Sequence, residues 1–102
     1  MRYLVSYDIS KDSIRTKIAK LCQKYGLARM QFSVFTGKTT RNMIETFAIE
    51  AKDTIGKKRG EKVIVIPICE RCQEKVISIS GGQSIQIGKE VAVLSKEKVV
   101  IV

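Results

Sequence analysis

The seven residues 3–9, with the sequence YLVSYDI, decide how this chain folds. Aromatic and β-branched side chains make the stretch typical of a strand, and one carboxylate, that of Asp8, lies near its end, just before a lysine-rich segment. A carboxylate at the tip of a buried strand costs free energy unless a cation or several hydrogen-bond donors meet it. We therefore expect Asp8 either to cap the next helix or to hold a functional ligand, such as a hard metal ion that arrives with a phosphate.

The segment after this strand predicts an amphipathic helix. Ser10 or Asp12 is expected to cap its start, and Gly26 is expected to end it. Apolar residues recur with the helical period and predict one buried face, made of Ile14, Ile18, Leu21, Cys22 and Tyr25. The opposite face is basic, with Lys11, Arg15, Lys17, Lys20 and Lys24.

The middle of the chain predicts two short strands and a second helix. Residues 27–37 are rich in β-formers and are expected to be extended, with a break near residues 31–33. The helix should begin at Thr39 or Thr40 and run to Ile55, before the glycine stop at Gly56. Its predicted buried face is made of Ile44, Phe47, Ala48, Ala51 and Ile55.

The last part of the chain predicts strands only. A basic loop at residues 57–60 leads to the aliphatic run 63–68, which is typical of a central strand, with Pro67 near its end. Gly81 and Gly82 indicate a turn. Further short strands are predicted at residues 76–80, 91–94 and 99–102.

This order of elements predicts an α+β fold. The pattern favours a ferredoxin-like sandwich, an antiparallel sheet with two helices on one face, in residues 1–80, followed by a β-rich tail in residues 81–102. The other face of the sheet would be left uncovered. Because exposed apolar sheet faces and edges promote association, we predict a homodimer in which the C-terminal strands pair onto the partner.

Composition limits the classes of function that remain. The chain has 102 residues, 44% of them hydrophobic, and no apolar stretch long enough to span a membrane, so we expect a soluble protein. It runs from Met1 straight into the predicted strand without a signal sequence, which favours a cytoplasmic location. Nineteen Lys and Arg against ten Asp and Glu give a net charge of +9. Clustered cations favour a polyanion such as nucleic acid, although a merely solvated surface is the alternative.

Four motifs, in this order, resemble those of the CRISPR-associated protein 2 family, the small subunit of the spacer-acquisition machinery. They are YDIS at residues 7–10, KYGL at 24–27, MQFSVF at 30–35 and ICERC at 68–72. The resemblance covers about residues 1–80. It implies a ferredoxin-like homodimer that binds nucleic acid, either duplex DNA or single-stranded RNA, and that partners the CRISPR integrase subunit. It also implies metal-dependent nuclease activity in some members, which integration does not require.

The resemblance assigns a role to Asp8, which corresponds to the metal-binding aspartate of the family. A dimer with its two first strands near the two-fold axis would bring two copies of Asp8 together. Two carboxylates, waters and a phosphate oxygen make a suitable Mg²⁺ site. Helix capping by Asp8 remains the alternative interpretation.

Other candidate residues lie within these motifs or between them. Arg15 and Arg29 match basic positions of the family and are predicted to hold phosphate, because guanidinium groups bind two oxygens at once. Lys11 and Lys38 are added as nucleic-acid contacts. Three further residues are expected to support the site: Tyr7, Ser33 and Phe35. Core packing is the expected role of Tyr7 and Phe35, with base stacking as the alternative for Phe35.

The cysteines form one pair, Cys69 and Cys72, with Cys22 apart on a helix face. Zinc would require a second pair from another chain, and a redox pair would require a helix start that this stretch does not indicate. We therefore expect thiols packed near a turn. A structural disulfide is not expected in a cytoplasmic chain.

The sequence thus predicts a nucleic-acid-binding subunit of CRISPR adaptation with a magnesium-dependent phosphodiesterase centre, an endoribonuclease or endodeoxyribonuclease, at paired Asp8 residues. The alternative is a non-catalytic dimeric scaffold that bridges the integrase subunits and holds duplex DNA. A regulatory dimer that binds a small ligand is a third interpretation, but the sequence has no glycine-rich phosphate loop to support it.

Overall fold

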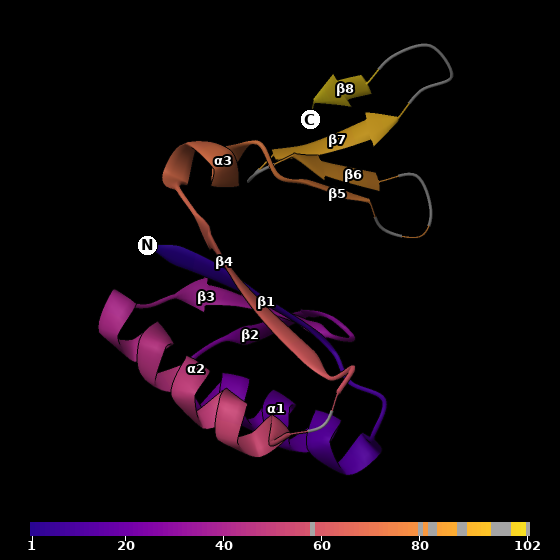
Figure 1. The fold of residues 1–102 in the computed structure, drawn as a ribbon. Coiled ribbons are helices and arrows are strands. Elements are labelled where there is room, and N and C mark those ends of the chain that lie inside the picture. The colour runs from indigo at the N-terminus through magenta and orange to yellow at the C-terminus, as the bar shows by residue number, and fades with distance from the viewer. Residues whose placement is uncertain (58, 80, 82–83, 88–89, 95–98, 102) are drawn as a thin grey trace. The chain divides into compact units, whose positions relative to one another are not determined.

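The computed structural model describes residues 1–57, 59–79, 81, 84–87, 90–94 and 99–101 (Figure 1). They form two compact units, Met1–Ile68 and Cys69–Val102. The elements of the first unit are β1 (Arg2–Asp8), α1 (Asp12–Lys24), β2 (Ala28–Gln31), β3 (Val34–Lys38), α2 (Arg41–Ile55) and β4 (Lys62–Ile68). Those of the second unit are α3 (Glu70–Glu74), β5 (Ile77–Ile79), β6 (Ser84–Ile87), β7 (Glu90–Leu94) and β8 (Val99–Ile101).

The first unit is an antiparallel sheet covered by two helices. The strand order is β2-β3-β1-β4, and β1 pairs with β3 on one side and with β4 on the other. Val5 in the middle of β1 lies opposite Phe35 and Val65. Helices α1 and α2 lie on the same side of this sheet (Figure 1). This arrangement is ferredoxin-like, so the predicted fold class is confirmed.

The core lies between the sheet and the two helices. Burial alternates along β1, where Tyr3, Val5 and Tyr7 face the helices. The buried side chains of the helices are Ile18, Ala19 and Cys22 on α1 and Ile44, Phe47 and Ala51 on α2. Full burial of one large apolar side chain contributes about 1.5–3 kcal/mol, so these residues hold the two layers together. Five of these buried residues belong to the predicted apolar faces, and Ala19 is buried although it was not predicted. Ala48 was predicted to be buried and is exposed.

The two long helices begin in different ways. Thr40 caps α2 by accepting a hydrogen bond from the Met43 backbone N–H at 3.2 Å, as predicted. The predicted cap of α1 is wrong, because its N-cap residue is Lys11 and no side chain among the described residues bonds to that helix end as a cap. Ser10 instead donates to Glu61, and Asp12 pairs with Arg15.

Strand β4 forms an edge of the sheet, not its centre, which corrects the expected position of the aliphatic run. Its alternate residues lie on two different faces. Val63 and Val65 pack against the core, whereas Ile64 and Ile66 are 54% and 45% exposed on the face without helices. An unbroken aliphatic run is typical of a strand buried on both sides, and here one of those sides is open within this unit.

The second unit is a four-stranded antiparallel sheet in the order β5-β6-β7-β8. Residues 77–79 pair with residues 85–87 in this sheet, so the compact units divide after Ile68, not at the expected boundary after residue 80. Helix α3 and strand β6 were not predicted. Four predicted elements each include one residue outside the described ones. These residues are Lys58 in the predicted basic loop, Ser80 in the predicted strand 76–80, Gly82 in the predicted turn and Val102 in the predicted terminal strand. Among the described helices, none has the length and apolar character that crossing a membrane requires.

Candidate nucleic-acid site

Asp8 is the last residue of β1 and is exposed. Because side chains alternate along a strand, Asp8 lies on the face of the sheet without helices, whereas its neighbour Tyr7 points into the core. In the described part of the chain, no hydrogen bond or ion pair engages the Asp8 carboxylate. It does not cap α1, so the structure contradicts the helix-capping alternative.

A metal at Asp8 would find hard oxygen chemistry but few protein ligands. Within the described residues, no three His, Cys, Asp or Glu side chains gather closely enough to hold a metal ion. One carboxylate is nevertheless compatible with Mg²⁺, which commonly keeps several waters and takes one or two carboxylates together with substrate phosphate. The remaining ligands would therefore be water, phosphate or a second copy of Asp8.

The two predicted phosphate-binding arginines meet at one aromatic ring. The guanidinium carbon of Arg15, on α1, lies 5.5 Å from the centre of the Phe32 ring, and that of Arg29, on β2, lies 5.9 Å from it. Arg29 also lies 4.9 Å from the centre of the Phe35 ring. Such distances are within the range of cation–π attraction. The structure thus brings together two cations that are fourteen positions apart in the sequence.

Hydrogen bonds fix this cluster at the turn between β2 and β3. The Phe32 carbonyl oxygen accepts from Arg29 Nη1 at 2.5 Å and from the Tyr7 hydroxyl at 3.4 Å. The Tyr7 backbone N–H donates to the Ser33 carbonyl at 3.0 Å. Burial raises the pKa of Tyr7, so its hydroxyl stays protonated and able to donate at neutral pH. The turn is therefore tied to the end of β1, directly beside Asp8.

Arg15 is held by contacts with the loop before α1 and with the first turn of α1. Its Nη1 donates to the Ile9 carbonyl at 3.3 Å, and its Nη2 pairs with the Asp12 carboxylate one turn earlier on α1. The first contact connects the guanidinium to the residue that follows Asp8. Arg15 therefore belongs to the same end of the sheet as the predicted metal ligand.

A hollow of about 510 Å³ lies between α1 and the β2–β3 turn, and we call it the Phe32 hollow. It is lined in part by Tyr7, Asp12, Arg15, Lys20, Arg29 and Phe32. Three cations and one carboxylate give this lining an excess of positive charge. The hollow is therefore suited to an anion with an aromatic or apolar portion.

The other predicted residues lie in different places. Lys11 is exposed at the start of α1, near the end of β1 that carries Asp8. Ser33 is half-buried, and its backbone carbonyl accepts the hydrogen bond from the Tyr7 backbone N–H. Lys38 lies opposite Arg2 at the other end of β1, about 20 Å from Asp8 along the strand, so the structure does not bring it to this cluster.

The aromatic residue available for stacking differs from the one considered. Phe35 has no exposed surface and stacks with Tyr7 inside the core, with ring centres 6.3 Å apart. Its predicted core role is confirmed, and its stacking alternative is wrong. Phe32, which sequence reasoning missed, is 70% exposed. A signal was present, because Phe32 falls inside the predicted break at residues 31–33, and a side chain at a turn tip projects outward.

The cysteine pair also departs from expectation. Cys69 is the N-cap of α3, and its sulfur accepts a hydrogen bond from the Cys72 backbone N–H at 3.4 Å, so the helix start judged absent is present. Both thiols are exposed and not packed. The hydrogen bonds from Cys72 lower the pKa of Cys69, and the bond to Cys69 raises the pKa of Cys72. Burial raises the pKa of Cys22 to about 12.

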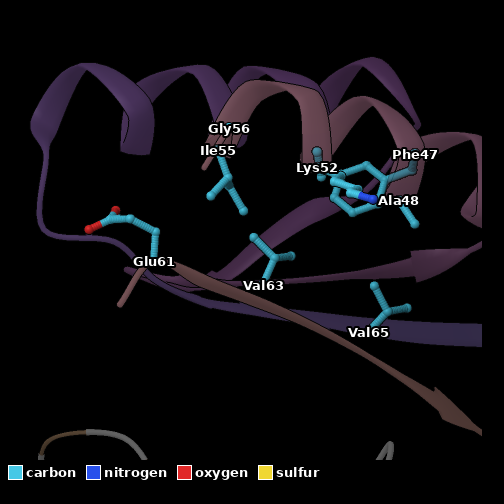
Figure 2. Close-up of a pocket in the computed structure, with 9 residues that line it drawn as sticks. Phe47, Ala48, Lys52, Ile55, Gly56, Glu61, Val63 and Val65 are labelled. Atoms are coloured by element: carbon cyan, nitrogen blue, oxygen red, sulfur yellow. The ribbon is translucent and has the colours of Figure 1, made fainter. Parts of the chain in front are cut away.

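A second hollow, of about 280 Å³, lies between α2 and β4 (Figure 2). Its lining is mainly apolar and includes Phe47, Ile55, Val63 and Val65. The Glu61 carboxylate points away from these side chains in Figure 2 and accepts two hydrogen bonds from Ser10, from Oγ at 2.7 Å and from the backbone N–H at 3.3 Å. Lys52 and Glu61 are the charged residues of this lining, and Glu61 anchors the loop that follows Asp8.

Comparisons with known proteins agree with this geometry. The family model described as CRISPR associated protein Cas2 matches residues 1–76. A relative from Desulforudis audaxviator (strain MP104C), named CRISPR-associated endoribonuclease Cas2, is 38% identical over 80% of this chain and 78% of the relative. A relative from Archaeoglobus fulgidus, named CRISPR-associated endoribonuclease Cas2 1, is 38% identical over 88% of this chain and 94% of its own length.

Solved structures have the same fold as the first unit. The crystal structure of Streptococcus pyogenes Cas2 at pH 6.5 matches with a TM-score of 0.68 and 24% identity, covering 78% of this chain and all of the other. A hypothetical protein from Thermus thermophilus, TT1823, matches with a TM-score of 0.60 and 26% identity, over 79% of this chain and 89% of the other. Because the family model matches residues 1–76, well over half of this chain, the chain belongs to the CRISPR associated protein Cas2 family.

Proposed function

We propose that this protein is a cytoplasmic nucleic-acid-binding subunit of CRISPR adaptation that cleaves phosphodiester bonds at paired Asp8 residues with Mg²⁺. The single observation that carries the proposal is the exposed Asp8 carboxylate, which has no partner among the described residues and lies at the same end of the sheet as Arg15 and Arg29. The names of the relatives, which are called endoribonucleases, support the nuclease part.

The residues of this chain have separate tasks in the reaction. Asp8 supplies a hard oxygen ligand, and Arg15 and Arg29 attract the phosphate backbone and fix its position. Bound Mg²⁺ would activate a water and neutralise charge on the phosphodiester oxygens. The chain has no histidine, so no imidazole is available as a general base.

A second copy of the chain would complete the site. Ile64 and Ile66 are exposed on the face of the sheet that also carries Asp8, and burial of these side chains against a partner would be favourable. Packing of two copies through this face would bring the two Asp8 carboxylates toward each other. We propose that the C-terminal strands extend this contact by pairing onto the partner, and that the dimer binds the integrase subunit.

The test is the Asp8→Asn variant, assayed for Mg²⁺-dependent cleavage of single-stranded RNA and of duplex DNA. Asparagine keeps the size and one acceptor but removes the ligand charge, so we expect the cleavage rate to fall by about 100-fold or more, while dimerisation and nucleic-acid binding remain. Asp53→Asn is the matched control, because Asp53 is an exposed carboxylate on α2, and it should cleave normally. Cleavage by purified Asp8→Asn at the parental rate would refute the nuclease role.

The non-catalytic scaffold is the second candidate. It is favoured by the small number of ligands near Asp8, since no three metal-binding side chains gather in the described residues. In this case the dimer bridges the integrase subunits, and its basic surface holds duplex DNA. If Asp8→Asn supports spacer integration together with the integrase, and the parent cleaves neither substrate with any divalent metal, the scaffold is the function.

A further inference from the structure

Phe32 is the one aromatic side chain among the described residues that is mostly exposed. It lies in the turn between β2 and β3 and is 70% exposed, whereas the other large exposed apolar side chains are Met or Ile. Exposure of an aromatic ring costs free energy unless a partner covers it. The catalytic proposal for Asp8 does not use this ring.

Several contacts hold the turn that carries this ring. Two donors, Tyr7 and Arg29, bond to the Phe32 carbonyl, and the guanidinium groups of Arg15 and Arg29 lie 5.5 and 5.9 Å from the ring centre. A ligand that stacks on Phe32 would therefore not have to order the turn first. Preorganisation of this kind raises affinity, because less conformational entropy is lost on binding.

The hollow beside the ring has the size and charge of a nucleotide site. Its volume of about 510 Å³ lies within the usual range for small-ligand pockets. Arg15, Lys20 and Arg29 contribute positive charge, and the single carboxylate, that of Asp12, is already paired with Arg15. Gln23 also lines the hollow, and its amide can both donate to and accept from a base edge.

We propose that Phe32 and the Phe32 hollow form a binding site for an unpaired nucleotide. The base stacks on the Phe32 ring, and Arg15, Lys20 and Arg29 hold the phosphates next to it. The inference rests on the proposed function in one respect, namely that the ligand of this protein is nucleic acid. It extends that function by defining the strand that is bound.

The ligand must be unpaired for a geometric reason. Inside a duplex, both faces of each base are covered by its neighbours in the stack, so a protein ring can stack only on a base in a single strand, at a frayed end or flipped out of the helix. A blunt duplex can contact the arginines through its backbone, but it offers Phe32 a free base face only at its two terminal pairs. The site therefore favours single strands or splayed ends over blunt duplexes.

The absence of tryptophan from the chain permits a direct test. Phe32→Trp introduces a single tryptophan whose fluorescence a stacked base should quench. Short oligothymidylate and oligouridylate are the single-stranded probes, and a blunt duplex of the same charge is the comparison. EDTA in the buffer keeps binding separate from any cleavage. We expect strong quenching by at least one single strand and little by the duplex. Ile49→Trp, at a 65% exposed position on α2, should be quenched by none.

Affinity measurements complete the test. Phe32→Ala should weaken single-strand binding by roughly 5- to 100-fold while duplex affinity changes less than about twofold. Ile49→Ala should change neither, and thermal unfolding should show that both variants fold. Unchanged single-strand binding by Phe32→Ala, or equal quenching of Phe32→Trp by single strand and duplex, would overturn the inference. Neither result would affect the role of Asp8, because that role is measured by cleavage.

Discussion

At the scale of single residues, the environment of each sulfur sets the reactivity of the three thiols. Cys69 accepts a hydrogen bond from the Cys72 backbone N–H at the start of α3, and this contact lowers the pKa of Cys69. A side-chain hydrogen bond with Cys69 raises the pKa of Cys72. Cys22 has no exposed surface, and burial raises its pKa to about 12. Because the thiolate is the nucleophile, the fraction of thiolate at neutral pH falls in the order Cys69, Cys72, Cys22.

We predict the same order for alkylation of the native protein by iodoacetamide, followed by mass spectrometry. The Cys69 rate should level off at a lower pH than that of an ordinary thiol, whereas the Cys72 rate should still rise there. Cys69→Ser removes the thiol that raises the Cys72 pKa, so Cys72 should react faster in this variant. Slower or unchanged labelling of Cys72 in Cys69→Ser would contradict the assigned coupling.

Residue identity predicted part of the site, and register decided the rest. Asp8, Arg15 and Arg29 were all predicted, because a carboxylate at a strand end can be recognised from the sequence and the two arginines match basic positions of the family. Phe32, and not Phe35, is the ring available for stacking, because β3 begins at Val34. Phe35 therefore lies in the strand and is buried, whereas Phe32 lies in the turn and is exposed. The distance of Lys38 from Asp8 likewise depends on pairing with Arg2.

At the scale of elements, one long-range contact fixes the loop between β1 and α1. Ser10 and Glu61 are 51 positions apart, and Glu61 Oε1 accepts from both the hydroxyl and the backbone N–H of Ser10. Among the described residues, Glu61 Oε2 is buried without a hydrogen-bond partner. Glu61 thus gives up part of its hydration to hold the loop that follows Asp8.

We predict that Glu61→Ala lowers the free energy of unfolding by about 1–2 kcal/mol, and Ser10→Ala by about 0.5–1.5 kcal/mol, because the second variant keeps the backbone bond. The double variant should be less destabilised than the sum, because both changes remove the same hydroxyl contact. Urea denaturation of the four proteins measures this cycle. Strict additivity would show that the contact makes no contribution in solution.

Helix faces and the start of α2 were predictable, whereas the start of α1 and the edge position of β4 were not. The 3.6-residue period places Ile18 and Cys22 on one face without any tertiary information. The predicted cap of α1 was wrong because the Ser10 side chain bonds to Glu61, far along the chain. Helix α3 was missed because five residues carry no period.

At the scale of the whole molecule, the division into two units follows from strand pairing that the sequence leaves open. The family model ends at residue 76, close to the start of β5, and β5 pairs forward with β6. Short strands such as β5 contain only three residues, too few to specify a partner by their alternation. The order of elements, in contrast, predicted the layers of the first unit, one antiparallel sheet with two helices on one face, because strand-helix-strand repeats have few compatible topologies. It did not predict that β4 lies at the edge of this sheet.

The last prediction concerns the self-association that the proposed metal site requires. If two copies pack through the helix-free face, Ile66→Lys places a charge in that contact and removes apolar surface from both protomers. We expect the dimer dissociation constant to rise by about two orders of magnitude or more, since burial of each Ile contributes about 1.5–3 kcal/mol. Sedimentation at micromolar concentration should show a dimer for the parent and a monomer for the variant. Ile49→Lys, which adds the same charge at an exposed position of α2, should remain dimeric. A monomeric parent would remove the second carboxylate from the site, and cleavage by such a monomer would assign the reaction to one Asp8.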